Sequence, residues 1–331
     1  NIAASKSRFA NRSPLIQKLR EATRVRGLAL NTERAYAAWV VDFIFFHGQQ
    51  HPADMGESEI TQYLTHLATA RTVSESTQNQ ALNALVFLYS HVLCKELGKF
   101  GEVPRAKRRL TLPECMTTEE VAKVFTCLPA EQALPIKLLY GAGLRLHECV
   151  TLRLKDLDFT LDRITVRDGK GEKDRLVPMP RSLKAALHEQ VGRATAIHAQ
   201  DERGGVSGVY LPDALARKYP GAAKSLAWFW LFPAKGISVD PRGGAKRRHH
   251  IHDATLQVAF KKAVKRAGLT GRKITCHTLR HSFCTALLNA NVPIHEVQAQ
   301  MGHESIETTM RYTHLLPNRK MVSPLDFQEK Q

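Results

Sequence analysis

Hydrophobic residues in the first hundred positions recur every three or four residues, and strand-like alternation is missing there. This spacing predicts amphipathic helices with one buried face each. Gly27 would end the first helix, and Asn31 and Thr32 are residue types that cap the start of the next. Residues 1–98 are therefore predicted to form a domain of four helices, at residues 13–26, from residue 31 or 32 through Phe46, at 57–70 and at 74–97.

The pattern changes between residues 99 and 115, where basic residues stand among prolines and glycines. Such a stretch is typical of a linker, so we predict the domain boundary here. Its cations are Lys99, Arg105, Lys107, Arg108 and Arg109. A capping box follows, with Thr117 at the cap and Glu120 three residues later, and it predicts the first helix of a second domain.

The second domain, predicted to span residues 116–314, mixes two hydrophobic periods. A helix is expected from Pro135 to about Gly141, and from Leu154 the period falls to two, which predicts three short strands with a glycine turn around Lys170. Helical spacing returns at residues 182–200, 253–267, 277–290, 294–301 and 306–312. Residues 201–252 show no regular period and are rich in Gly, Pro and Trp. After the last predicted helix, residues 315–331 form a C-terminal tail. The expected fold class is mainly α with a small antiparallel β-sheet (α+β).

Net charge adds a functional clue to this fold. The 331 residues include 48 Lys and Arg against 31 Asp and Glu, a formal net charge of +17. An excess of this size favours a polyanionic partner, nucleic acid before membrane, and it makes the basic linker a predicted DNA clamp. The same excess also fits a protein that is merely basic.

Other features narrow the compartment and the chemistry. No apolar run approaches the ~20 residues of a membrane span, and the first residues lack the apolar core of a signal peptide. The six cysteines are scattered without a C-x-x-C pair, which fits a reducing cytoplasm. Nucleotide-binding and H-E-x-x-H motifs are missing, and a surface or DNA-contacting role is favoured over metal binding for His249, His250 and His252. We expect no cofactor and no metal.

What stands out in the second domain is a series of basic, imidazole and phenol side chains, namely Arg145, Lys170, His277, Arg280, His303 and Tyr312. The first follows a glycine turn at the start of a predicted helix, and the second sits at the predicted hairpin tip. His277 and Arg280 are three residues apart, so they share one face of a helix. Each of these residues or pairs alone is weak evidence for an active site, because isolated examples are usually ordinary surface or core residues.

In this order and spacing, the series resembles the active site of the tyrosine recombinase (phage integrase) family, and the resemblance extends over residues 13–314. It implies a helical, SAM-like core-binding domain at 1–98 and a catalytic domain at 116–314, which together form a C-shaped clamp around DNA. It also implies a homotetramer on two DNA sites. The tail at 315–331 either packs on its own domain or docks on a neighbouring subunit, and the resemblance favours exchange between subunits.

The resemblance implies that Tyr312 attacks a phosphodiester and forms a 3′-phosphotyrosine, which conserves the bond for rejoining without ATP. Attack by a phenolic oxygen builds negative charge on the other phosphate oxygens. Two fixed guanidiniums, Arg145 and Arg280, would hold that charge in place of metal ions.

Proton transfers complete the chemistry that the resemblance implies. Lys170 would reach the leaving 5′ oxygen from the hairpin and protonate it, with Lys173 as the competing residue. His277 would assist proton transfer from Tyr312, and His303 would hydrogen-bond the scissile phosphate.

A finer resemblance rests on an insert at about residues 203–250. Its segments 211–221 and 228–233 resemble the extra segment of integron integrases, which recombine a folded single strand, a hairpin with extrahelical bases, and so integrate and excise gene cassettes. The resemblance implies base contacts by Trp228, Trp230, Pro241, His249 and His250. The alternative is that the aromatic residues of the insert form the core of a small subdomain.

Contacts to the DNA backbone are expected from Arg105, Lys107, Arg108, Arg109, Lys173, Lys246, Arg247 and Arg248. The predicted function is a site-specific DNA recombinase of the integron type, acting on the bacterial nucleoid. Three alternatives stay open: a recombinase on conventional duplex sites, such as a phage integrase or chromosome-dimer resolvase, a type IB topoisomerase, and a non-catalytic DNA-binding protein.

Overall fold

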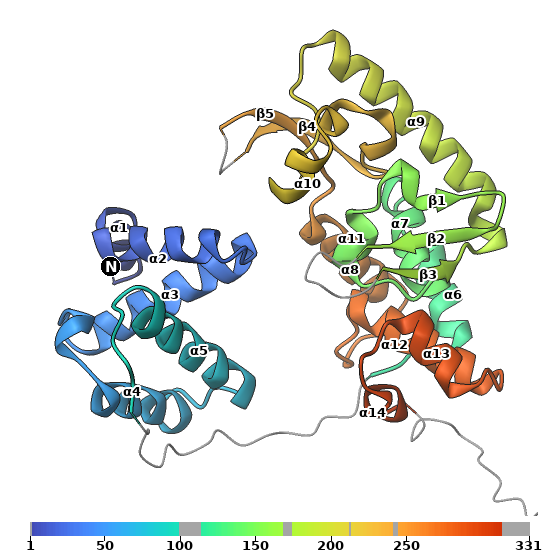
Figure 1. The fold of residues 1–331 in the computed structure, drawn as a ribbon. Coiled ribbons are helices and arrows are strands. Elements are labelled where there is room, and N and C mark those ends of the chain that lie inside the picture. Colours follow the sequence, from blue (N-terminus) through green and yellow to red (C-terminus); the bar gives the residue numbers. More distant parts are fainter. Residues whose placement is uncertain (1, 99–113, 168–173, 212, 241–243, 313–331) are drawn as a thin grey trace, which may run out of the picture. The chain divides into compact units, whose positions relative to one another are not determined.

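The computed structural model describes residues 2–98, 114–167, 174–211, 213–240 and 244–312 (Figure 1). The chain divides into two compact units, Asn1–Thr111 and Leu112–Gln331. The predicted hairpin tip, most of the predicted linker and the predicted tail lie outside the described residues. Among the described helices, none combines the length and the apolar character needed to cross a bilayer.

The described part of the N-terminal unit is helical, as predicted, but contains one α-helix more than expected. Its elements are α1 (Ile2–Arg12), α2 (Pro14–Val25), α3 (Leu30–Phe46), the 3₁₀ turn η1 (Pro52–Asp54), α4 (Glu57–Thr69) and α5 (Glu75–His91). The predicted four-helix bundle overlooked α1, which has a mostly polar sequence and packs against α3. Asn31 and Thr32 do not cap α3, because the helix begins at Leu30 and its cap is Ala29. Helix α5 ends at His91, before the predicted Leu97.

A single apolar core holds this unit together. Side chains at helical spacing on α2, α3, α4 and α5 meet in it, and they include Ile16, Val40, Phe43, Tyr63, Leu67 and Leu88, each fully or almost fully buried. Tyr63 also donates a hydrogen bond of 2.6 Å to Asp42, which pairs with Lys6 at 2.6 Å. The last contact ties α1 to α3, so the unpredicted helix is anchored by charge as well as by packing.

The second unit begins with the predicted capping box. The backbone amide of Glu120 donates to Thr117 Oγ1 at 3.2 Å, and the amide of Thr117 donates to Glu120 Oε2 at 3.0 Å. This motif starts α6 (Thr118–Thr126). The next helix, α7 (Ala130–Gly141), starts five residues before Pro135, whereas the sequence predicted a start at that proline. Pro135 is buried inside the helix, and its neighbours Ile136 and Leu139 are core residues.

Three short antiparallel strands follow, and they confirm the predicted small sheet. They are β1 (Leu157–Asp158), β2 (Arg163–Val166) and β3 (Arg175–Pro178), paired in that order, with Ile164 opposite Val177. Ile164, Val166 and Val177 face the core, while the residues between them are more exposed. In β2 and β3 the buried and exposed faces therefore alternate as predicted. The first predicted strand differs, because Leu154–Asp156 forms a 3₁₀ turn and only Leu157–Asp158 pairs as a strand.

The insert contains a second sheet that sequence analysis missed. Helix α9 (Lys184–Arg203) runs from the first sheet toward the hairpin of β4 (Pro233–Val239) and β5 (Lys246–His250) (Figure 1). In the sequence, α9 and β4 are separated by α10 (Asp213–Lys218) and two 3₁₀ turns, η4 (Ala222–Lys224) and η5 (Leu226–Trp228). Strand β4 is mostly exposed and β5 reads Lys-Arg-Arg-His-His, so neither shows an apolar alternation.

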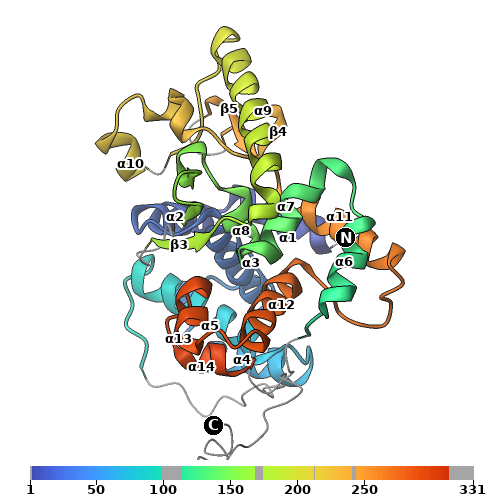
Figure 2. The ribbon, with the colours of Figure 1, turned by 90° about the vertical axis from the view of Figure 1, so that its right-hand side faces the viewer.

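The remaining described elements complete the second unit. They are α8 (Leu146–Val150), η2 (Leu154–Asp156), η3 (Arg181–Leu183), α11 (Asp253–Arg266), α12 (Cys276–Asn289), α13 (Ile294–Met301) and α14 (Ile306–Met310). Helices α12, α13 and α14 pack together, as Figure 2 shows. The mainly helical fold with small antiparallel sheets is the predicted class.

Candidate active site

A glycine turn brings α8 and α12 together at the start of the candidate site. Gly143 has φ +63°, and a Cβ on it would lie 2.5 Å from the ring of Phe283 in α12. The turn therefore needs glycine both for its backbone conformation and for this close approach. Its carbonyl accepts a 2.5 Å hydrogen bond from Arg280 Nη1. The next residues place Arg145 at the N-cap of α8.

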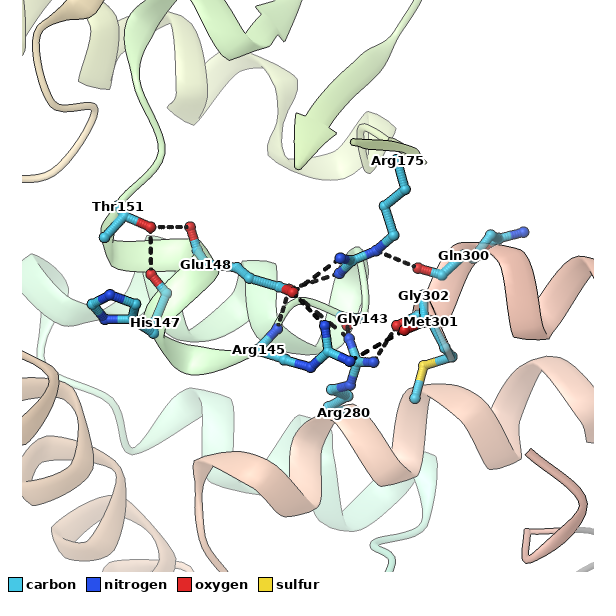
Figure 3. A network of polar contacts seen from close by, with 10 residues as sticks. All are labelled: Gly143, Arg145, His147, Glu148, Thr151, Arg175, Arg280, Gln300, Met301 and Gly302. Carbon is cyan, nitrogen blue, oxygen red and sulfur yellow. Dashed lines mark hydrogen bonds and ion pairs between the residues drawn. The ribbon is translucent and has the colours of Figure 1, made fainter. Parts of the chain in front are cut away.

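Glu148 is the centre of the polar network drawn in Figure 3. Its carboxylate accepts hydrogen bonds from the backbone amide of Arg145 at 2.7 Å and from Arg145 Nη1 at 2.8 Å. Arg175 of β3 adds a two-pronged contact at 2.9 and 2.6 Å, and Arg280 Nη1 lies 4.0 Å away. One carboxylate thus organises three guanidiniums from three separate elements.

The charge state of Glu148 follows from these contacts. Burial alone would raise the pKa of its carboxyl, but the hydrogen bonds and charge of Arg175 and the hydrogen bonds from Arg145 outweigh it and lower the pKa to about 2. The group is therefore ionised at every physiological pH.

Arg280 is the most enclosed of the three arginines. Its side chain is only 3% exposed, and its Nη2 donates to the carbonyl of Met301, at the end of α13. Burial, followed by repulsion from Arg145, lowers the pKa of Arg280 to about 10, so the guanidinium stays charged at neutral pH. Arg145 Nη2 donates to the neighbouring carbonyl of Gly302 at 3.2 Å. Both arginines are therefore fixed against the turn that follows α13.

That turn also requires a glycine. Gly302 has φ +60°, and a Cβ on it would lie 2.8 Å from Cδ of Arg175. Arg175 Nε donates to the carbonyl of Gln300 at 3.1 Å. The turn thus fits closely around Arg175 and presents the next residue, His303, to the site.

Tyr312 follows α14 and is 5% exposed. Its hydroxyl lies 2.5 Å from Nδ1 of His281 in α12. The ring of His303 lies nearly parallel to the Tyr312 ring at 6.3 Å, and its Nδ1 is 2.9 Å from Thr309 Oγ1. Burial and the neighbouring Cys284 raise the pKa of Tyr312 to about 12, although Arg280 opposes the shift.

The histidines in the site and beside it are neutral at physiological pH in the absence of a ligand. Burial, His277 and Arg280 lower the pKa of His281 to about 4. Burial, Arg280 and Arg145 do the same for His303, whose pKa is also about 4. The pKa of His277 is lowered by burial and then by Arg280. A neutral imidazole can accept a proton or a hydrogen bond, which the protonated form cannot do.

The structure brings four of the six residues of the predicted catalytic series into one site: Arg145, Arg280, His303 and Tyr312. His277 is exposed at the start of α12 and touches the ring of His281, at 4.6 Å between centroids. Lys170 lies outside the described residues, as do Lys173, Pro241 and the linker residues Arg105, Lys107, Arg108 and Arg109.

Three residues of the site, Glu148, Arg175 and His281, were not among the predicted site residues. Glu148 comes three residues after Arg145, the spacing of a capping residue. Arg175 ends the mixed-charge segment that begins at Lys170, and His281 directly follows Arg280. The spacing of Glu148 from Arg145 and the position of His281 next to Arg280 are local signals that could have pointed to these two residues, whereas Arg175 has no such signal.

Two residues of the insert are not available to DNA, contrary to prediction. Arg248 was expected on phosphates, but it is buried and pairs with Asp201 of α9 at 2.5 and 2.6 Å. Trp230 was expected to stack on a base, but it is 4% exposed, donates to the carbonyl of Arg248 at 3.0 Å and lies under the guanidinium of Arg153 at 4.0 Å. The alternative interpretation, that these rings form a core, holds for Trp230.

Other predicted insert residues keep an accessible part. Lys246 is exposed, whereas Arg247 is largely occupied by Asp240 at 3.4 Å and by backbone carbonyls. Trp228 is partly exposed, with the Lys155 ammonium 2.8 Å from its ring centroid. His249 stacks on Tyr210 at 6.5 Å, and His250 contacts the edge of Trp230 at 5.1 Å, each partly exposed.

Asp201→Asn should lower the free energy of unfolding by about 2 kcal/mol. The substitution keeps the shape but removes the charge that pairs with buried Arg248, and charged hydrogen bonds are worth about 1.5–3 kcal/mol. Chemical denaturation measures the difference. Glu189→Gln, on the same helix, is the matched control because its pair with Arg193 is exposed, and it should leave stability unchanged. Equal effects of both variants would contradict the structural role of Arg248.

The fold and the site together define a class of protein. A buried arginine and a second arginine share one carboxylate, and a tyrosine hydroxyl contacts the histidine that follows the buried arginine, in a helical domain with a small sheet. Residues 112–319 match the model of the phage integrase family, and residues 15–99 match that of the phage integrase N-terminal SAM-like domain. The chain belongs to the phage integrase family, the tyrosine recombinases.

Relatives agree with this assignment, and a solved structure shares the fold. An "Integrase/recombinase" of Escherichia coli is 48% identical over 314 residues, covering 94% of this chain and 93% of the relative. The "Tyrosine recombinase XerD" of Agrobacterium fabrum is 28% identical over 313 residues, covering 89% and 87%. The fold is similar to that of a XerH site-specific recombinase bound to difH substrate, with a TM-score of 0.58 and 20% identity over 93% of this chain and 84% of that one.

Proposed function

We propose that this tyrosine recombinase is an integron integrase, which cleaves and rejoins DNA strands through a 3′-phosphotyrosine and so integrates and excises gene cassettes. The observation that carries the chemistry is the convergence of Arg145 and Arg280 on the turn that leads to His303, beside the hydroxyl of Tyr312. Tyr312 Oη attacks the scissile phosphorus, the bond to the 5′ oxygen breaks, and the phosphate stays on the enzyme.

The arginines supply the electrostatic part of this reaction. A guanidinium fixed by carbonyls and a carboxylate needs no reorganisation when charge develops on the phosphate, which is the condition for strong transition-state stabilisation. Arg280 meets this condition because both of its terminal nitrogens are held by backbone carbonyls. Lys170, in the connection between β2 and β3, donates the proton to the leaving 5′ oxygen. The conserved bond energy makes ATP unnecessary, and the cations take the place of metal ions.

We further propose that the substrate is a folded single-stranded hairpin with extrahelical bases. The insert supports this, because the rings of Trp228, His249 and His250 are partly exposed, and both histidines share strand β5 with the exposed Lys246. Rings of this kind stack on an unpaired base for about 1–3 kcal/mol. Pro241 would complete the contact.

The rest of the chain would grip and assemble on DNA. Residues 1–98 and the basic linker at 99–115 bind the backbone, residues 116–314 hold the active site, and the tail at 315–331 docks on a neighbouring subunit in a homotetramer on two sites. Solved relatives with this fold include a XerH recombinase bound to its difH substrate, which supports a DNA partner. The site of action would be the nucleoid in the bacterial cytoplasm.

A second candidate function is recombination of conventional duplex sites. One observation in its favour is the relative named XerD, which is 28% identical. Another is the burial of Trp230, which was expected to contact an extrahelical base, and of Arg248, which was expected to contact the DNA backbone.

One experiment tests the chemistry and separates the two substrates. The protein is incubated with EDTA on nicked substrates made as bulged hairpins and as fully paired duplexes, and the covalent adduct is digested and mapped by mass spectrometry. The proposal expects an adduct on Tyr312, formed faster on the hairpin. A faster reaction on the duplex would support the second candidate, and a need for divalent metal would contradict the mechanism.

Trp228→Ala should weaken binding of the bulged hairpin about tenfold or more and leave the matched hairpin nearly unchanged. The reason is that only an unpaired base can stack on the ring. Fluorescence anisotropy with labelled hairpins measures both affinities. Equal losses on the two hairpins would show that Trp228 contributes packing rather than base recognition.

A further inference from the structure

His281 has no role in the mechanism so far, although it makes the closest polar contact of Tyr312. It follows Arg280 on α12 and is half-buried. Its Nδ1 lies 2.5 Å from Tyr312 Oη, and the two rings are tilted by 36° with centroids 5.3 Å apart. At this distance a neutral imidazole accepts the phenolic hydrogen bond at Nδ1.

We propose that His281 is the base of the cleavage step, an assignment that rests on the proposed function of Tyr312 as nucleophile. As the bond between Oη and phosphorus forms, the phenolic proton moves to Nδ1 of His281. The bond from phosphorus to the 5′ oxygen breaks, and that oxygen takes a proton from Lys170. In rejoining, the steps run backwards and His281 returns its proton to Tyr312.

The other histidines are placed less well for this step. His277 is exposed at the first turn of α12, and among the described residues no hydrogen bond joins it to Tyr312; it contacts the ring of His281 instead. His303 meets the Tyr312 ring face to face at 6.3 Å, while its Nδ1 is engaged with Thr309. A base must lie within hydrogen-bond reach of the proton it takes, and this criterion selects His281.

The surroundings of His281 link its basicity to substrate. The groups that face it are His277 and Arg280 on its own helix, Tyr312, and His303 before α14. Burial, His277 and Arg280 keep it neutral before DNA arrives. A phosphate anion bound at Arg280 offsets the nearby positive charge, so the imidazole becomes a stronger base when the scissile phosphate is in place.

The decisive variant is His281→Asn, because its amide oxygen can accept the Tyr312 hydrogen bond near the position of Nδ1 but cannot take the proton. Adduct formation should slow by about 10²- to 10⁴-fold, the usual worth of general base catalysis. The wild-type rate should level off with rising pH, whereas the variant rate should keep rising because Tyr312 must ionise unaided. His277→Asn tests the competing histidine, and it should keep the levelling profile if His281 is the base. His295→Asn, at an exposed histidine on α13, is the matched control and should keep both the rate and the profile.

A substrate with sulfur in place of the bridging 5′ oxygen separates base from acid. Its thiolate leaves without a proton, so it should restore cleavage to Lys170→Ala but not to His281→Asn. His281→Ala adds a second test. Added imidazole should restore cleavage to this variant, at a rate proportional to the concentration of neutral imidazole. Thermal unfolding and DNA affinity confirm that each variant is folded.

The outcomes distinguish this inference from the proposed function. A wild-type adduct on Tyr312 with an undiminished rate in His281→Asn would overturn the role of His281 alone, as would restoration of that variant by the sulfur substrate. Slower adduct formation in His277→Asn alone would show that His277 is the base instead of His281. No adduct on Tyr312 of the wild-type protein with any substrate would overturn the proposed function and the inference together.

Discussion

Tyr312→Phe should abolish the covalent protein–DNA adduct while leaving the fold and DNA affinity almost unchanged. The substitution removes only the phenolic oxygen, the atom that would attack phosphorus. The ring itself is 5% exposed and packs in a cluster with Phe283, Val297 and Met301, and phenylalanine keeps this packing. The lost hydrogen bond to His281 should change the free energy of unfolding by about 1 kcal/mol.

The measurement is adduct formation on a nicked substrate under denaturing electrophoresis, with DNA affinity from a gel shift. Tyr140→Phe is the matched control, because Tyr140 packs against the same cluster from α7 and should keep full adduct formation. An adduct that persists in Tyr312→Phe would show that another residue is the nucleophile, and the active site would have to be reassigned.

The residues proposed to react stand in motifs that the sequence shows, whereas the residues that hold them in place do not. Arg145, Arg280 and Tyr312 stand in recognisable motifs, and the structure brings them together. Arg175 could not be found in the same way, because its partners Glu148 and Gln300 are 27 and 125 residues away. Contacts of that range are set by the tertiary fold, and no local pattern records them.

In the insert, the composition predicted DNA-contacting residues, but the structure shows that some of these residues are packed inside the fold. A basic run next to aromatic residues predicted DNA contacts, yet Arg248 is paired with Asp201, 47 residues earlier on α9. Trp228 and Trp230 are two residues apart, and only Trp230 is fully buried. A sequence can show that such residues alternate, but the neighbouring helix decides which of them faces inward.

Glu148→Gln should cause the largest loss of stability among single charge substitutions at the site, about 3 kcal/mol at pH 7. The carboxyl pKa is about 2 in the folded protein against an ordinary 4.5, and lowering a pKa by one corresponds to about 1.4 kcal/mol of stability. Because the folded pKa is depressed, this stability is present above about pH 4.5 and is lost as the pH falls toward 2. The difference between wild type and variant should therefore shrink on acidification, as measured by denaturation at pH 7 and pH 3.

Glu131→Gln is the matched control, since its carboxylate pairs with Lys235 in solvent and should leave stability unchanged. A variant of Glu148 as stable as wild type at pH 7, or a difference that persists undiminished at pH 3, would contradict the network. The same substitution should also change the chemistry. Arg145, Arg175 and Arg280 carry three positive charges against one carboxylate, so the network keeps a net charge of +2.

The net charge of +2 on this network is equal and opposite to the charge that the reacting phosphate approaches in the transition state. A phosphodiester carries one negative charge at rest and approaches two when the phenolic oxygen adds, so a net +2 favours the transition state over the resting diester. Removing the charge of Glu148 leaves +3 and frees the arginines from their fixed positions. Glu148→Gln should therefore bind DNA as tightly as wild type or more tightly, yet form the adduct at least 100-fold more slowly in single-turnover measurements. Weaker binding with an unchanged rate would show that Glu148 serves the fold alone.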